Sequence, residues 1–172
     1  MKLKTPFNSS YWVISNQLLV GELPIANNEK DTIIKLNHLI DLNISAVINL
    51  MEPDEKDHSG NLFFNYQTHL NSQDINTHQF PIKDMDVPSP IQMMRILKQI
   101  EFYVKQNKTV YVHCWGGLGR TGTVVGCYLL ANGLADPSNV LERIIELKAN
   151  SSLSDKESPQ TSAQREFILD WA

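Results

Sequence analysis

One cysteine in the chain stands where its sulfur could act as a nucleophile. The segment HCWGGLGRTG, residues 113–122, follows an apolar run and precedes an apolar stretch of helical length. Gly116, Gly117 and Gly119 allow the backbone to bend so that successive N–H groups point at one anion, and the following helix adds its positive end. A loop of this kind can bind a phosphoryl group. A thiol at its start, Cys114, lies in a field that favours the nucleophilic thiolate.

Other side chains of this loop supply further parts of one mechanism. Five residues separate Arg120 from Cys114, and its guanidinium can fold back to match two phosphoryl oxygens. The Thr121 hydroxyl can donate to the departing sulfur, and the ring of His113 can order the loop. A cysteine at a strand end is usually a buried apolar residue, but this combination favours catalysis. The phosphate would be bound by Arg120 and by the loop itself: Trp115, Gly116, Gly117, Leu118 and Gly119. The Trp115 side chain either lines the pocket or merely packs.

The same ten residues resemble the signature of the cysteine-dependent protein-tyrosine and dual-specificity phosphatases, which have His-Cys, five residues, then Arg and Ser or Thr. The GGLGR core is most similar to the compact kinase-associated-phosphatase type and its bacterial and archaeal relatives. A looser resemblance extends from about Tyr11 to Trp171. The resemblance implies a phosphocysteine intermediate and neither a metal nor another cofactor.

A second loop offers a carboxylic acid. The segment FPIKDMDVPSP, residues 80–90, holds two aspartates in a proline-framed loop that could close over a substrate and protonate its leaving oxygen. The residues alone do not choose between Asp84 and Asp86, and either could be a solvated or capping side chain. In the family, Pro-Ile-x-Asp is followed four residues later by proline, here Pro88. The resemblance therefore implies that Asp84 is the acid, with Asp86 as the alternative.

The C-terminal segment SPQTSAQREFILDW, residues 158–171, resembles a stretch in the bacterial relatives where a glutamine near a helix start orients the hydrolytic water. Gln164 is the best positional match and Gln160 the second. The resemblance thus implies a catalytic role for Gln164. The alternative is a surface glutamine on an ordinary helix.

Several other residues have structural interpretations. Cys127 could trap an oxidised Cys114 as a disulfide, but core packing is the favoured role. Gly122 and Gly126 share one helix face, and we expect them to allow close packing against the sheet. An acidic run is interpreted as a solvated loop, with substrate contact as the minority alternative: Glu52, Asp54, Glu55 and Asp57.

The elements that must position these residues follow from hydrophobic periodicity. Short apolar runs at 44–50 and 109–114 are β-branched, as expected for central strands covered on both faces. Runs at 11–14 and 18–21 predict a hairpin, and weaker strand candidates are 63–70 and 78–82.

Helix starts are indicated by capping residues. Asn28 is expected to cap a helix that runs to about Leu42, and the stretch after the glycine loop is expected to end at Gly133. Three pairs place a capping oxygen before a proline: Ser89-Pro90, Asp136-Pro137 and Ser158-Pro159. Helices between strands predict an α/β fold with a small, mostly parallel central sheet flanked by helices, and a hairpin at its edge. The resemblance implies the same phosphatase-like fold.

Composition restricts the class of protein further. The 172 residues, 42% of them hydrophobic, suffice for one domain over 1–172, with weak order expected in 1–10. A net charge of −4 argues against nucleic acid or anionic membrane as a partner. No apolar run reaches the roughly 20 residues of a membrane span, and no secretory leader is recognisable. Cytoplasmic residence is the default expectation, beside a secreted effector without a cleaved signal. The two cysteines make no disulfide framework, and the histidines show no zinc spacing.

Three functions remain at this point. The first is hydrolysis of phosphotyrosine in a protein or peptide, extending to phosphoserine or phosphothreonine in the dual-specificity case. The second is the same chemistry on a phosphoinositide or an RNA 5′ end, which the neutral loop at 115–119 disfavours. The third is a phosphoprotein-binding module without turnover. The natural substrate, the pathway and the oligomeric state are left open by the sequence.

Overall fold

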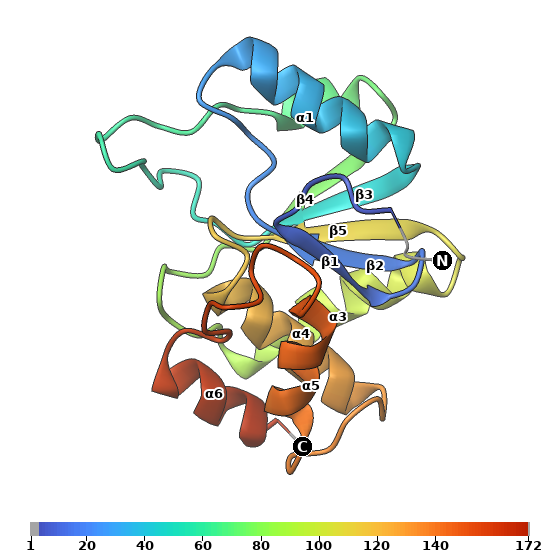
Figure 1. Ribbon diagram of the computed structural model, residues 1–172, viewed down its shortest axis with the longest axis vertical. Helices are drawn as coiled ribbons and strands as arrows, with labels where there is room; N and C mark the ends of the chain where they lie inside the picture. The colour runs from blue at the N-terminus through green and yellow to red at the C-terminus, as the bar shows by residue number, and fades with distance from the viewer. Residues whose placement is uncertain (1–3, 172) are drawn as a thin grey trace.

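A single five-stranded sheet forms the centre of the structure, a computed structural model that describes residues 4–171 (Figure 1). The strand order is β1-β2-β5-β3-β4. Only β1 and β2 pair antiparallel, and the other neighbours are parallel. The predicted sheet, with a hairpin at its edge, is therefore confirmed. The strands are β1 (Ser10–Ile14), β2 (Leu18–Gly21), β3 (Ile44–Asn49), β4 (Asn76–Gln79) and β5 (Thr109–His113).

The central strands end together at one edge of the sheet. In the strand register, Gly21 at the end of β2 and Asn49 at the end of β3 both lie opposite His113, the last residue of β5. Ligands of parallel α/β sheets bind beyond the carboxyl ends of the strands. The loop that begins at Cys114 leaves the sheet at this edge.

Helices cover both faces of the sheet. Helix α1 lies on one face, and α3 to α6 lie on the other (Figure 1). Helices α3 and α4 both contact β5, α5 contacts β1, and α6 packs on α4. Their bounds are α1 (Glu29–Asp41), α2 (Gln67–Asn71), α3 (Pro90–Val104), α4 (Gly119–Ala131), α5 (Val140–Lys148) and α6 (Ser162–Leu169).

Two of the predicted helix starts are confirmed. The Asn28 side chain accepts a hydrogen bond from the Asp31 N–H at 2.9 Å and caps α1. The Ser89 hydroxyl oxygen accepts from the Gln92 N–H at 3.2 Å, and Pro90 occupies the first helical position of α3.

The start predicted at Asp136-Pro137 is three residues too early. The Asp136 carboxylate accepts hydrogen bonds from the Ser138 N–H at 2.8 Å and from the Asn139 side chain at 3.0 Å. These bonds close a separate turn, and α5 begins after it at Val140.

The start predicted at Ser158-Pro159 is also wrong. The Ser158 hydroxyl donates to the Leu118 carbonyl at 2.9 Å instead of capping a helix. Helix α6 begins at Ser162, because Thr161 and Gln164 form a reciprocal capping box.

The strand expected at 63–70 is a helix in its second half. Tyr66 and Leu70, four residues apart, are both buried, as on one face of a helix, and α2 covers Gln67–Asn71. The strand expected at 78–82 begins two residues earlier as β4. Beyond its end, the Phe80 N–H still donates to the Asn49 carbonyl at 2.9 Å.

The core lies between the sheet and its helices, and one expected packing contact is different. A Cβ added at Gly126 would lie 2.5 Å from Ile168 Cδ1, so this glycine allows α6, rather than the sheet, to approach α4. Of the residues expected to be weakly ordered, 1–3 lie outside the described part. Phe7 packs against the Tyr111 ring at a centroid distance of 5.7 Å.

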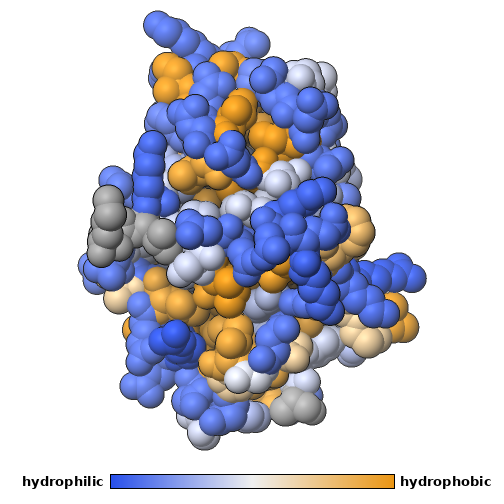
Figure 2. Space-filling view, turned by 90° about the vertical axis from the view of Figure 1, so that its right-hand side faces the viewer, coloured by the Kyte–Doolittle hydropathy of each residue, from blue (hydrophilic) through white to orange (hydrophobic). Residues whose placement is uncertain are grey.

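The surface carries both hydrophilic and hydrophobic side chains. Hydrophilic side chains cover most of the face in Figure 2, and hydrophobic ones show between them in separate groups. Within residues 4–171, none of the helices has the length and apolar character that crossing a membrane requires.

Candidate active site

Cys114 is the first residue after β5, and its surroundings fix it from both sides. The Leu50 N–H donates to the His113 carbonyl and the Leu23 N–H donates to the Trp115 carbonyl, both at 2.9 Å. The cysteine is 3% exposed. Segments after β2 and β3 therefore hold the main chain immediately before and after the thiol.

The loop turns sharply at Gly117, where φ is +72°. A Cβ there would lie 2.4 Å from the Gly21 carbonyl carbon, so only glycine fits against the end of β2. Two residues later α4 begins at Gly119. The N–H groups of its first turn have no partner within the helix and point back toward the loop. The glycine-rich loop and helix start expected from the sequence are thus present.

Arg120 lies inside the protein and is held by a carboxylate. Its guanidinium donates from Nη1 to Glu55 Oε2 at 2.7 Å and from Nη2 to Glu55 Oε1 at 2.8 Å. Nη1 also donates to the Ile82 carbonyl at 3.1 Å. The Arg120 side chain is 1% exposed and that of Glu55 9%, so this is a buried bidentate pair.

One edge of the guanidinium remains for a ligand. The Arg120 Nε atom is buried and has no hydrogen-bond partner among residues 4–171. Burial alone would lower the pKa of Arg120. The hydrogen bonds with Glu55 and the negative charges of Cys114, Glu55 and Asp84 outweigh burial and raise that pKa. The arginine is therefore a permanent cation with an unsatisfied donor, which an anionic phosphoryl oxygen can occupy.

The two candidate acids have different surroundings. Asp84 Oδ1 lies 2.9 Å from Arg120 Nη2, and the Asp84 side chain is 51% exposed. The Asp86 carboxylate instead accepts from its neighbour, the Val87 N–H, at 2.8 Å. Met85 between them has a positive φ of +62°. The structure thus brings Asp84, not Asp86, to the arginine.

Two further residues of the loop motif, Thr121 and His113, are also buried. Thr121 Oγ1 is buried and has no hydrogen-bond partner within the described chain, so its hydroxyl is free to donate to a nearby anion. His113 is fully buried, and burial lowers its pKa to about 4.

The hydrogen-bond partners of the neutral His113 ring determine which of its two nitrogens carries the proton. Its Nδ1 lies 2.9 Å from the Cys114 carbonyl, which can only accept, so Nδ1 carries the proton. Nε2 is then the acceptor, and it accepts a hydrogen bond from the Tyr66 hydroxyl at 2.5 Å. This chain of hydrogen bonds fixes the main chain at the nucleophile position.

Gln164 reaches the same region from α6. Its side-chain oxygen accepts from the N–H groups of Gln160 and Thr161 at 3.1 and 3.2 Å, and its amide donates to the Asp86 carbonyl at 3.1 Å. A Cβ on Gly119 would lie 2.7 Å from Gln160 Oε1 and 3.0 Å from Gln164 Nε2. Both candidate glutamines therefore lie against the start of α4, and Gln164 is fully buried rather than on the surface.

Trp115 and Cys127 are two residues for which the sequence leaves alternative roles open. Trp115 packs edge-on against Phe63 at a centroid distance of 5.0 Å and tilts against His58 at 4.8 Å. Cys127 is fully buried on α4, and burial raises the pKa of its thiol, so it is an inert core residue.

Across residues 4–171, no cluster of three His, Cys, Asp or Glu side chains could hold a metal ion.

Sequence reasoning missed Glu55 and Tyr66. Glu55 lies in the acidic run for which the sequence favours a solvated loop, and it is instead the main partner of Arg120. A signal existed, because a buried guanidinium requires a carboxylate, and this run follows β3 at the edge where Arg120 lies. The spacing could not show which of the four acidic residues turns inward.

The chain was compared with known proteins. Residues 6–168 match the family described as Swiss Army Knife protein, DSP-PTPase phosphatase domain. The protein tyrosine phosphatase domain-containing protein 1 of Mus musculus is 30% identical over 164 residues, which are 92% of this chain and 21% of that protein. The chain spans 17 to 60% of the first curated relatives, so these are longer proteins.

Solved structures share the fold. Tk-PTP in the active form superposes with a TM-score of 0.70 at 24% identity, over 95% of each chain. PTPMT1 in complex with PI(5)P superposes with a TM-score of 0.71 at 19% identity, over 95% of this chain and 94% of that one. The family match covers nearly all of the chain. The protein therefore belongs to the dual-specificity and protein-tyrosine phosphatase superfamily of cysteine-based hydrolases.

Proposed function

We propose that the chain hydrolyses phosphotyrosine in a protein or peptide through a phosphocysteine intermediate. The observation that carries this proposal is the hydrogen bonding of the buried Arg120 guanidinium. Its terminal nitrogens Nη1 and Nη2 are bound by Glu55, while Nε is buried and has no partner among the described residues. A cation prepared in this way suits a phosphoryl group poised over the thiolate.

The first step displaces the leaving oxygen. Nε and Nη2 form one side of the guanidinium fork, and Asp84 now lies at Nη2. Among the acidic partners of Arg120, Asp84 is the exposed one, so an arriving phosphoryl group exchanges with it. The Cys114 thiolate then forms an S–P bond as the P–O bond of the ester breaks. Asp84, protonated at that stage, gives its proton to the leaving oxygen.

The second step hydrolyses the phosphocysteine and regenerates the free cysteine. Water attacks phosphorus, the Asp84 carboxylate takes a proton from that water, and the S–P bond breaks to release inorganic phosphate. The Thr121 hydroxyl donates a hydrogen bond to the departing thiolate. The proposed role of Gln164 is to position this water. Its oxygen already accepts two N–H groups, so only its amide nitrogen, which has a second N–H, is available for that task.

The choice of phosphotyrosine over a phosphoinositide rests on charge. A structural neighbour, PTPMT1, was crystallised with PI(5)P, so the fold accommodates such a ligand in that protein. Residues 115–119 of this chain carry no cationic side chain, and the net charge is −4. An inositol phosphate with several anionic groups would therefore find little attraction here beyond Arg120.

Turnover of matched peptides tests the proposal. A phosphotyrosyl peptide, its phosphoseryl counterpart and phosphatidylinositol 5-phosphate vesicles are offered to native protein and to Cys114→Ser with EDTA present. Fastest release of phosphate from the phosphotyrosyl peptide, abolished in the variant, is the expected result. Comparable phosphoseryl turnover would extend the activity to dual specificity. Faster turnover of the vesicles would overturn the peptide assignment. Tight peptide binding without turnover by native protein would indicate a binding module.

A further inference from the structure

A hollow of about 720 Å³ adjoins the phosphate-binding loop. We call it the Trp115 groove. Its walls are the segment after β2, the first turn of α1, and part of the long connection between β3 and α2. Trp115 itself lines it, and the Leu23 N–H, from another wall, is bonded to the Trp115 carbonyl. A peptide whose phosphorylated residue lies over Cys114 therefore has this groove beside it.

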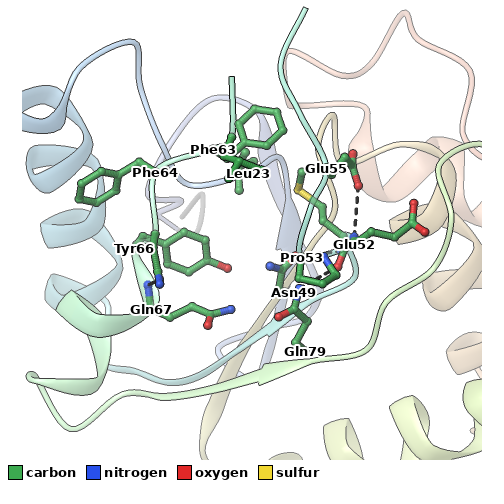
Figure 3. A pocket seen from close by; sticks show the side chains of 13 residues that line it. Leu23, Asn49, Glu52, Pro53, Glu55, Phe63, Phe64, Tyr66, Gln67 and Gln79 are labelled. Atoms are coloured by element: carbon green, nitrogen blue, oxygen red, sulfur yellow. Dashed lines mark hydrogen bonds between the residues drawn. The ribbon is translucent and has the colours of Figure 1, made fainter. Parts of the chain in front are cut away.

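The groove has an aromatic wall. Trp115, His58 and Phe63 pack together, and Phe64 beside them is 37% exposed. Figure 3 shows the neighbouring pocket, which shares Leu23, Phe63 and Phe64 with the groove, and there the Phe63 and Phe64 side chains point in different directions. Aromatic walls of this kind pack against the hydrocarbon stems of long side chains.

The charge of the groove is negative. Three carboxylates line it, at Glu22, Glu29 and Asp57, against one cation, Lys35. Lys35 Nζ is bound to Glu22 Oε1 at 2.6 Å and donates to the Ile25 carbonyl at 3.1 Å. That cation is therefore neutralised within the groove wall.

The other two carboxylates, Glu29 and Asp57, lie outside that ion pair. Within residues 4–171, neither Glu29 nor Asp57 forms an ion pair. The Asp57 Oδ1 atom accepts from the N–H groups of Ser59 and Asn61, both at 2.9 Å. The hydrogen bonds from Asn61 and Ser59 lower the pKa of Asp57, so the side chain is ionised at neutral pH.

We infer that the Trp115 groove binds an arginine or lysine side chain of the substrate, a few residues from the phosphotyrosine. The stem of that side chain packs on the aromatic wall, and its charged head meets Glu29 and Asp57. A polyanionic inositol phosphate would meet the same carboxylates as like charges. This inference rests on the proposed function, and it defines the peptide class as basic phosphotyrosyl peptides.

The test uses phosphotyrosyl peptides that place Arg, Ala or Glu in turn at each flanking position. Native protein is expected to show a kcat/KM about fivefold higher for the best Arg peptide than for its Ala counterpart, and the preference should shrink in high salt. The double variant Glu29→Gln, Asp57→Asn should lose this preference. Asparagine retains an oxygen for the Ser59 and Asn61 N–H groups. The control Glu142→Gln, Asp170→Asn makes the same charge change at exposed positions of α5 and at the end of α6 and should keep the preference.

Turnover of p-nitrophenyl phosphate, which has no flanking residues, separates the two proposals. If all three proteins hydrolyse it equally and native protein shows no preference for Arg peptides, the groove inference is overturned and the phosphatase proposal stands. If native protein hydrolyses neither this ester nor any peptide, the proposed function itself fails. An equal loss of preference in the control variant would also overturn the groove inference, because bulk charge would explain it.

Discussion

The Glu55 carboxylate binds both terminal nitrogens of Arg120, at 2.7 and 2.8 Å, across 65 residues of sequence. The guanidinium is therefore oriented before a substrate arrives, with Nε directed away from Glu55 and without a hydrogen-bond partner in the part of the chain that the structure describes. A pre-oriented donor costs little reorganisation when charge develops on the phosphoryl oxygens.

Replacing Glu55 should weaken phosphate binding. In Glu55→Gln the buried guanidinium loses one charged acceptor, which costs about 2 kcal/mol, or roughly 30-fold in kcat/KM. Turnover of p-nitrophenyl phosphate and its inhibition by inorganic phosphate would measure the effect. Glu52→Gln is the matched control, because Glu52 lies in the same acidic run and forms no ion pair within residues 4–171. Equal losses in both variants would contradict the role of Glu55.

The loop glycines should differ in their tolerance of a methyl group. Gly117→Ala forces a Cβ to within 2.4 Å of Gly21 backbone at a positive φ, so we expect the loop to lose its shape and kcat/KM to fall at least 100-fold. At Gly116 an added Cβ meets nothing within 4 Å, and Gly116→Ala should stay within about threefold of native activity. Kinetics together with circular dichroism would check both variants. Full activity of Gly117→Ala would show that the backbone contact can relax.

The sequence predicted what is encoded locally. The loop at 113–122 could be predicted because strand, glycines, cysteine and arginine are adjacent in the chain. The central strands could be predicted because their residues are almost all apolar. Helix starts at Asn28 and Ser89 followed from one capping side chain each.

The contacts that complete the site could not be predicted in the same way. Glu55 with Arg120 and Tyr66 with His113 join segments 65 and 47 residues apart, and no local pattern specifies such pairs. The start of α6 was missed for another reason. Thr161 and Gln164 have the spacing of a capping box, but Ser158-Pro159 offered a competing signal that tertiary contact with Leu118 overrides.

Lys148 should prove important for the segment that precedes the two glutamines. It is 2% exposed, and its Nζ donates to the carbonyls of Leu153, Ser154 and Lys156 at 2.7 to 2.9 Å. Lys148→Met leaves these carbonyls without their donor, which should cost about 3 kcal/mol of unfolding free energy. It should also lower kcat more than it raises KM, because Gln160 and Gln164 follow this segment.

Denaturant unfolding and steady-state kinetics would measure these two effects. Lys156→Met is the control, since that exposed residue contributes only its carbonyl to the cluster and keeps it in the variant. Native stability in Lys148→Met would show that the three hydrogen bonds are replaced by water.

The proposed acid can be identified by its dependence on the leaving group. Asp84→Asn cannot donate a proton, so it should lose about 100-fold in kcat on phenyl phosphate and much less on p-nitrophenyl phosphate, whose leaving oxygen needs no proton. Asp86→Asn should lose little on either ester, because only its main-chain carbonyl contacts Gln164. The opposite pattern between the two variants would assign the acid to Asp86.

The buried His113 should make stability depend on pH in a definite window. Its pKa is lowered by burial to about 4 in the native state, against about 6.5 in the unfolded chain. Between these values the unfolded chain binds the proton and the native protein does not, so the free energy of unfolding falls as pH decreases from about 6.5 to 4. The full effect is about 3 kcal/mol, and it levels off below pH 4 because both states are then protonated.

His113→Asn isolates this contribution. Asparagine keeps an N–H that can donate to the Cys114 carbonyl but does not titrate, so the variant should be less stable at pH 7 and lose less on acidification. Urea unfolding of both proteins at several pH values between 4 and 7 would give the two slopes, and their difference cancels the other titrating groups. Equal slopes would mean that the pKa of His113 is the same in the native and the unfolded protein, which would contradict its burial as a neutral ring. A greater loss of stability on acidification in His113→Asn than in native protein would mean that His113 is protonated in the native state. Its Nε2 would then be unable to accept the hydrogen bond from the Tyr66 hydroxyl, and the order of donors around the cysteine would have to be reversed.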